Sequence, residues 1–193
     1  MFFAKRPPAP VIDRFLEESR RLSLSYGEVG IAQTSGAGYD LDDSTVSIGQ
    51  GRDAFEAAKA ALVAWKHYDF DWVEVCPSTP PVLPGTVVAV LIRHYGFWSL
   101  NGCRVVYGLG DRSHGSRFGF AYGTLANHAE RGEEIFEIAH RPETGEVVYR
   151  IRAASQPRAV LARAGYPLVR RLQARFRRDS ADAMRRAVAH RLR

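Results

Sequence analysis

The sequence predicts an α+β fold in which a curved antiparallel sheet of about six to seven strands packs around a long C-terminal helix. Three observations support this prediction. A helical pattern comes early in the chain, a series of segments with a period of two residues follows, and an amphipathic stretch ends it. We expect a single domain over residues 1–193, because 193 residues with 46% hydrophobic side chains fit one core.

The first third of the chain is expected to hold two helices and a strand. Apolar residues spaced three and four apart predict a short amphipathic helix over 11–22, and residues 28–33 have the composition of a strand. A second helix is predicted over 53–66, where Asp53 and Glu56 have the spacing of a capping box.

The middle of the chain has the pattern of an antiparallel meander. Segments rich in β-branched and aromatic residues alternate there with Gly, Pro, Asn and Asp. The clearest hairpin joins two of these segments across the turn-forming residues 141–145. The six predicted strands are Trp72–Val75, Thr86–Ile92, Cys103–Leu109, Phe118–Leu125, Glu134–His140 and Glu146–Ala153.

The chain is predicted to end in a long helix from Pro167 to Arg191, preceded by a shorter turn over 158–164. Its arginines are expected on the face opposite the apolar one. The apolar stripe consists of Leu168, Val169, Leu172, Phe176, Ala183, Met184, Ala187 and Val188.

Positive charge is concentrated at the C-terminal end. From Arg158 onward the chain has eleven arginines and two aspartates, a balance of +9 that leaves −3 for the first 157 residues. Such a face suits RNA, an anionic membrane or plain solvation. Arginine outnumbers lysine 24 to 3 in a chain rich in Ala, Gly and Val, a bias typical of GC-rich coding. We therefore favour a solvated face and expect no specific nucleic-acid binding.

Several functional classes are excluded by composition. The longest apolar run, Val87–Ile92, is far shorter than the ~20 residues that cross a bilayer, so we expect no stable membrane insertion. Cys76 and Cys103 are far apart and have no C-x-x-C spacing, which disfavours a disulfide framework or a zinc site. With no signal peptide visible, we expect a cytoplasmic protein.

One motif resembles a dinucleotide-binding fingerprint. Gly49-x-Gly51-x-x-Ala54 precedes a helix, and acidic Glu74 follows about 20 residues later. A Rossmann domain needs further βαβ units, whereas this motif is followed by consecutive strands. We interpret the glycines as a turn into the helix and expect no cofactor.

The segment 118–134 is the strongest candidate for chemistry. Alternation places Phe118, Phe120, Tyr122 and Thr124 on one face of a strand, and we expect Tyr122 to lie beneath the C-terminal helix with its hydroxyl hydrogen-bonded. The following loop places His128, Glu130, Glu133 and Glu134 close in sequence. An imidazole beside carboxylates can transfer protons or bind a divalent ion. The spacing matches no zinc template, so we predict no metal site.

Two arginines near these strands have a structural interpretation. Arg104 and Arg117 flank a predicted hairpin, and we expect them to pair with Glu134 or Glu137 across the sheet. Trp65, Trp72 and Trp98 are expected in the core.

The same segment resembles a bacterial and plant family known as the domain of unknown function numbered nineteen-ninety. Residues 120–125, His128, Glu130 and Gly132-Glu133-Glu134 look like its signature, whereas Ala126 and Ala129 replace expected prolines. The order of elements more distantly resembles the helix-grip fold of the START and polyketide-cyclase-like proteins, which implies apolar ligands between sheet and helix. Further matching positions are Tyr26–Gly30, Gly49, Gly51, Phe55, Trp65, Trp72, Pro84-Gly85, Asn101, Cys103–Tyr107, Ser155, Pro157 and Gln173.

Three functional hypotheses remain open. The leading one is binding of a small, largely apolar ligand in a cavity between the sheet and the C-terminal helix. The second is a hydrolase, lyase or cyclase that uses His128 with Glu130 or Glu133. The third is an interaction module that binds RNA or an anionic membrane through its arginine-rich helix. In the first hypothesis the ligand is oriented by Tyr122, Thr124, Tyr107, Arg104 and His128.

Overall fold

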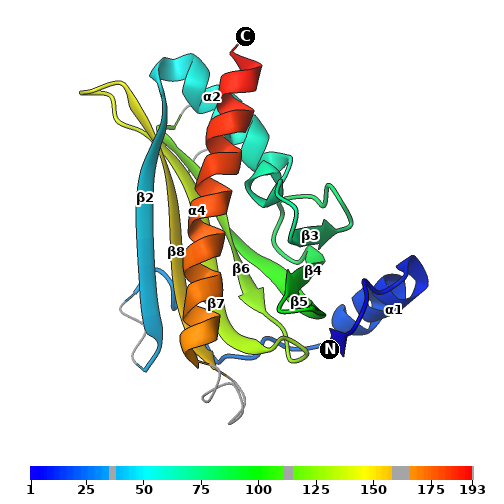
Figure 1. Ribbon diagram of the computed structural model, residues 1–193. Coiled ribbons are helices and arrows are strands. Elements are labelled where there is room, and N and C mark those ends of the chain that lie inside the picture. The colour runs from blue at the N-terminus through cyan, green and yellow to red at the C-terminus, as the bar shows by residue number, and fades with distance from the viewer. Residues whose placement is uncertain (35–37, 111–114, 158–165, 193) are drawn as a thin grey trace.

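The computed structural model describes residues 1–34, 38–110, 115–157 and 166–192, and its main feature is one antiparallel sheet. Six consecutive strands form the predicted meander, in the order β8-β7-β6-β5-β4-β3 (Figure 1). A further strand, β2 (Asp40–Gln50), pairs with β8, and β1 (Phe2–Phe3) pairs with β5. The meander strands are β3 (Val73–Cys76), β4 (Val87–His94), β5 (Phe97–Leu109), β6 (Arg117–Thr124), β7 (Glu130–His140) and β8 (Glu146–Pro157).

The helices divide between the two faces of the curved sheet. The long helix α4 (Tyr166–Arg191) and α2 (Gly51–Val63) cover the concave face, together with the short helix η1 (Lys66–Tyr68) (Figure 1). On the convex side, α1 (Ala9–Ser19) packs on β4 and β5. This arrangement is the predicted helix-grip fold.

Aromatic rings fill the space between the sheet and α4. Phe120 and Phe136 are fully buried on adjacent strands, with ring centroids 5.5 Å apart. Tyr68 of η1 and Phe176 of α4 pack on Phe136 at 6.0 and 6.3 Å. The centre of the grip is therefore a packed core.

Docking of α4 is uneven along its length. Met184 and Val188 in its second half are buried, Leu172 and Phe176 are partly buried, and Leu168 is 38% exposed, so the predicted stripe is wrong at Leu168. Within the described ranges, no helix is both long and apolar enough to cross a membrane. The predicted turn at 158–164 lies outside the described residues.

Two local predictions near the N-terminus are wrong. Residues 28–33 form turns rather than a strand, because Gly30 has a positive φ of 102° and the backbone N–H groups of Gly30 and Ala32 bind the Glu133 carboxylate. The second helix begins at Gly51 after Gln50, without a side-chain cap, so Asp53 does not form the predicted capping box.

We expect Phe136→Ala to lower the free energy of unfolding by about 3 to 5 kcal/mol, because it removes a fully buried ring from the centre of the core. Urea unfolding measures this loss. The control is Phe97→Ala, which truncates a ring that is 54% exposed and should change stability by less than about 0.5 kcal/mol. Equal midpoints for the two variants would contradict the proposed core.

Candidate functional site

Tyr122 lies on the concave face beneath α4, as predicted, and is only 8% exposed. Its hydroxyl donates to Oε2 of Glu134 at 2.7 Å and lies 2.7 Å from the hydroxyl of Tyr68. Since the single proton of Tyr122 is used toward Glu134, Tyr68 is the donor in the second bond. On the convex side Gly123 leaves room for Tyr26, because a Cβ there would be 2.1 Å from the Tyr26 hydroxyl.

Glu130 and Glu134 form a carboxyl pair under α4. They are four residues apart on β7 and share its concave side, where Gln173 of α4 donates to Oε1 of Glu130 at 2.9 Å. Burial raises the pKa of each carboxyl to about 7, and the charge of Glu130 adds to the rise at Glu134. Both groups therefore exchange protons near neutral pH, and Glu134 is the one that the enzyme hypothesis did not name.

The arginines of α4 nearest this carboxyl pair form ion pairs with Asp42. Arg170 uses two nitrogens to bind the carboxylate of Asp42 on β2, and Arg177 approaches the same carboxylate at 3.2 Å. Glu130 and Glu134 are left with neutral donors from an amide and a phenol. Neutral partners stabilise a carboxylate less than an ion pair does, which is consistent with the raised pKa values.

Glu133 faces the opposite side of the sheet, where it binds residues of the 26–32 segment. Its carboxylate accepts hydrogen bonds from the hydroxyls of Tyr26 and Tyr107, at 2.9 and 2.5 Å, and from the backbone N–H groups of Gly30 and Ala32. Four donors occupy this buried carboxylate. Glu133 therefore anchors the 26–32 segment, and it does not share a site with Glu130.

The other predicted site residues bind backbone groups. Arg104 donates to the carbonyls of Arg20 and Leu22, at 3.1 and 2.9 Å. The Thr124 hydroxyl accepts from the N–H of Gly132 at 2.9 Å, and His128 Nδ1 accepts from the N–H of Glu130 at 2.9 Å.

The predicted group is therefore divided between the two faces of the sheet. Tyr122 and Glu130 are concave, whereas Tyr107, Arg104 and Glu133 are not. Of the two arginines expected to pair with Glu134 or Glu137, Arg117 pairs with Glu137, whereas Arg104 donates to backbone carbonyls instead.

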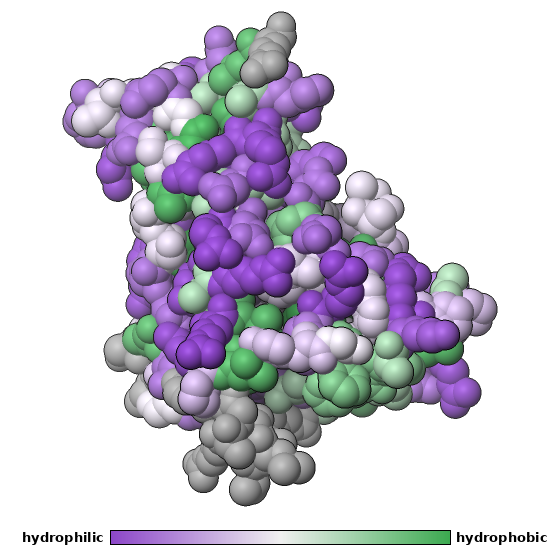
Figure 2. Space-filling model, viewed as in Figure 1, coloured by the Kyte–Doolittle hydropathy of each residue, from purple (hydrophilic) through white to green (hydrophobic). Residues whose placement is uncertain are grey.

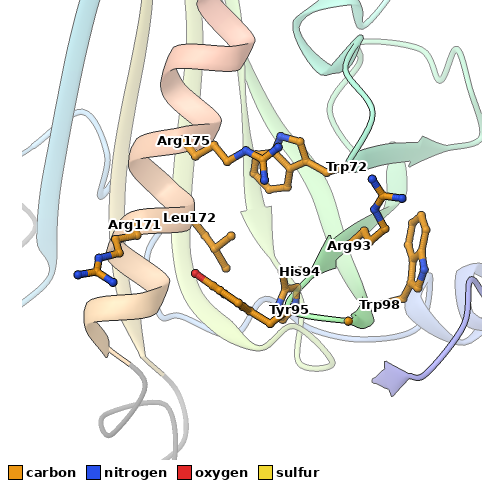
Figure 3. Close-up of a pocket in the computed structure, with 9 residues that line it drawn as sticks. Trp72, Arg93, His94, Tyr95, Trp98, Arg171, Leu172 and Arg175 are labelled. Carbon is orange, nitrogen blue, oxygen red and sulfur yellow. The ribbon is translucent and has the colours of Figure 1, made fainter.

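A groove opens between α4 and the β4–β5 hairpin (Figure 3). Its volume is about 510 Å³. The hairpin closes through Tyr95 and Gly96, both at positive φ, as a two-residue turn of the primed type requires. Figure 3 shows Tyr95 pointing toward Leu172 of α4. The lining residues are Trp72, Arg93, His94, Tyr95, Gly96, Trp98, Arg171, Leu172 and Arg175.

One end of the groove is fixed by a tryptophan. Trp72 is buried, and its indole N–H donates to Asp179 of α4 at 2.9 Å. The guanidinium of Arg175 lies over the same ring, 4.5 Å from its centroid (Figure 3). Trp72 is in the core as predicted, as is Trp65, whereas Trp98 is only partly buried and faces the groove.

The carboxyl pair predicts stability that falls as the pH rises. A folded-state pKa of about 7 exceeds the ordinary glutamate value, so the folded protein retains protons that the unfolded chain releases. The stabilisation is complete below the ordinary value and is lost as the pH rises through 7. Between pH 6 and 8 we expect a loss of about 1 kcal/mol per carboxyl.

Glu134→Gln should make the free energy of unfolding fall less steeply with pH, since a glutamine resembles the protonated acid and does not ionise. Urea unfolding from pH 6.5 to 8 measures it. Burial lowers the pKa of His67 to about 3, so only the unfolded chain binds a proton at this imidazole near pH 6.5, and this opposing contribution is the same in the wild type and both variants. Glu143→Gln, at an exposed turn position, is the matched control and should keep the wild-type slope. A wild-type slope in Glu134→Gln would show that this carboxyl is already ionised throughout the range.

Solved structures with the same fold have little sequence identity to this chain. A hypothetical protein of Helicobacter pylori superposes with a TM-score of 0.58 at 11% identity, covering 87% of this chain and 97% of that one. The Zhui aromatase/cyclase of Streptomyces sp. R1128 gives 0.51 at 12% identity, covering 80% and 96%. At such identities the likeness shows the fold alone, which is the START and cyclase-like helix-grip.

Sequence relatives span nearly the whole chain. A UPF0548 protein of Dictyostelium discoideum is 33% identical over 207 residues, covering 97% of this chain and 96% of the relative. A UPF0548 protein of Arabidopsis thaliana is 36% identical over 156 residues, covering 78% and 74%. The family model described as Domain of unknown function (DUF1990) matches residues 25–183. The chain therefore belongs to the DUF1990 family.

Proposed function

We propose that the protein binds a small, largely apolar molecule in the groove between α4 and the β4–β5 hairpin. The observation that carries this proposal is the hollow of about 510 Å³, whose walls include Trp72, Tyr95, Trp98 and Leu172. Its volume lies in the range of about 300 to 1,000 Å³ that is typical of small-molecule sites. Aromatic and aliphatic walls supply apolar contact area at little cost in side-chain entropy.

The position of this groove changes the predicted mode of binding. Phe120, Phe136 and Tyr68 already occupy the centre of the grip. A ligand in the groove lies at the open end of the grip instead, beside Leu172. The orienting roles predicted for Tyr122, Thr124, Tyr107, Arg104 and His128 stay predictions, and none of these five residues lines the groove.

A second candidate function is proton transfer by Glu134. The supporting observation is a partly buried carboxyl with a pKa of about 7, joined by hydrogen bonds to Tyr122 and Tyr68. A general acid or base works best when its pKa is near the working pH. The predicted pairing of His128 with Glu130 or Glu133 receives less support, because Glu133 is held by four donors on the other face.

The interaction-module hypothesis also stays a prediction. The outer face of α4 is mostly hydrophilic (Figure 2), and several of its arginines are exposed. Arg178 pairs with Asp179, and Arg185 pairs with Asp182. These pairs reduce the charge that is free to bind phosphates, which supports solvation as the main role of this face.

Nile red, a neutral dye that fluoresces in apolar surroundings, provides a direct test. We expect saturable binding of one dye per chain, weakened about tenfold by Leu172→Asn, since burying a leucine side chain is worth about 1.5 to 3 kcal/mol. The matched control is Leu168→Asn, one helical turn away at a residue that does not line the groove.

A second pair of variants tests the other wall. Tyr95→Asn removes a groove residue, and asparagine tolerates the positive φ at this position. Phe97→Asn removes an aromatic residue of similar exposure on the same hairpin, 54% against 55%, that does not line the groove. Equal effects of the groove and control variants, or no saturable dye binding, would overturn the proposal.

A further inference from the structure

We infer that the groove recognises an anionic group, a carboxylate or a phosphate, through Arg93 on β4 and Arg175 on α4. This inference rests on the proposed function, and it adds the chemical class of the ligand: an amphipathic acid with a flat apolar body. Figure 3 shows Arg175 over Trp72, and Arg93 on the β4 wall beside Trp98.

The lining has a one-sided charge. Three of its nine residues are arginines and none is acidic. A purely apolar ligand makes no hydrogen bond to a guanidinium group. A carboxylate or phosphate, in contrast, accepts two hydrogen bonds from the paired N–H donors of the guanidinium group. The charge complementarity therefore favours an acid over a neutral ligand.

The two arginines remain available to a ligand although each has an acidic neighbour. Arg93 approaches Asp71 at 3.6 Å, and their side chains are 53% and 78% exposed. Arg175 binds Asp179 through Nε at 3.2 Å. Exposed pairs of this kind contribute little, and a guanidinium has five N–H donors, so an incoming anion has donors left to bind.

Trp72 positions one of the two guanidinium groups. Its ring supports Arg175 at 4.5 Å, while its indole N–H and Arg175 Nε both donate to Asp179. This arrangement holds the guanidinium over the ring, and the bond to Asp179 uses Nε rather than a terminal nitrogen. A preorganised guanidinium loses less entropy on binding an anion.

Arg171 adds positive charge, but it is not part of the clamp, the pair Arg93 and Arg175 that binds the anion. It lies one helical turn before Arg175, is exposed, and makes no ion pair with any residue that the structure describes. Figure 3 shows its side chain pointing away from the groove. Arg171 and Arg175 lie on the same helix and carry the same charge. Comparing their variants therefore distinguishes direct contact with the anion from a general effect of positive charge.

The test uses three probes with the same aromatic body. These are 2-naphthoate, 1-naphthyl phosphate and the neutral 2-naphthamide, and binding is followed by calorimetry on the full-length protein. We expect at least one of the two anions to bind the wild type about tenfold more tightly than the amide, as a charge-assisted hydrogen bond provides. Comparison of the two anions identifies which group the clamp prefers.

Variants then locate the anion subsite. Arg175→Gln and Arg93→Gln should each reduce the preference for the anion to about threefold or less without weakening the amide, because they remove only charged donors. Arg171→Gln, the matched control, should keep the preference within about twofold. Arg93→Gln lies on the other wall, so the test stands even if Arg175→Gln unfolds.

Three outcomes would overturn the inference. They are equal affinity of both anions and the amide for the wild type, an equal loss in Arg171→Gln and Arg175→Gln, and binding of anionic phosphatidylserine vesicles without binding of either naphthyl anion. If naphthamide and Nile red bind in the groove without a preference for anions, the clamp fails and the proposed function stands. If no probe binds, the proposed function fails as well.

Discussion

The docking of α4 across the concave face is the interaction on which the rest of the molecule depends. Phe176 packs on Phe136 at the centre, and Tyr149 of β8 meets Ser180 at 2.9 Å farther along the helix. At the β2 edge, Asp42 binds Arg170 and Arg177. This docking encloses the carboxyl pair of Glu130 and Glu134 and also provides one wall of the groove, so a single helix creates both candidate sites.

Two adjacent glutamates show how strand alternation assigns chemistry. Glu133 and Glu134 are neighbours in β7, and successive side chains of a strand point to opposite faces. Glu133 meets two hydroxyls and two backbone N–H groups and serves as an anchor. Glu134 accepts a hydrogen bond from the Tyr122 phenol, and burial raises its pKa to about 7. The same side chain therefore has a structural role on one face and an ionisable one on the other.

Elements with a periodic pattern of apolar residues could be predicted from the sequence, because burial of one face of a helix or strand imposes that period. The meander, the helix at 51–63 and the inward placement of Tyr122 follow from such patterns. The strand β2 (Asp40–Gln50) was largely missed, since its polar residues hide the alternation at a sheet edge. Residues 28–33 resemble a strand in composition, but their N–H groups bind a carboxylate about 100 residues later.

The candidate groove could not be predicted from local patterns. Trp72, Arg93 and Arg175 come from three separate elements, and only the docking of α4 brings them together. Each has an ordinary local interpretation, as a core ring or a solvated charge. A partial signal was present in the excess of arginine on α4, but that excess does not distinguish Arg175, which is supported by Trp72, from Arg171, which points away.

The groove and the carboxyl pair meet in one turn of α4. Leu172 lines the groove, and the next residue, Gln173, donates to Glu130 on the other side of the same turn. A change in the docking of this turn therefore acts on both sites. Where a ligand binds more tightly to one docked position of the turn, linkage requires protonation of Glu130 and ligand affinity to change each other by the same factor. Because the pKa of Glu130 is about 7, such coupling would fall near neutral pH.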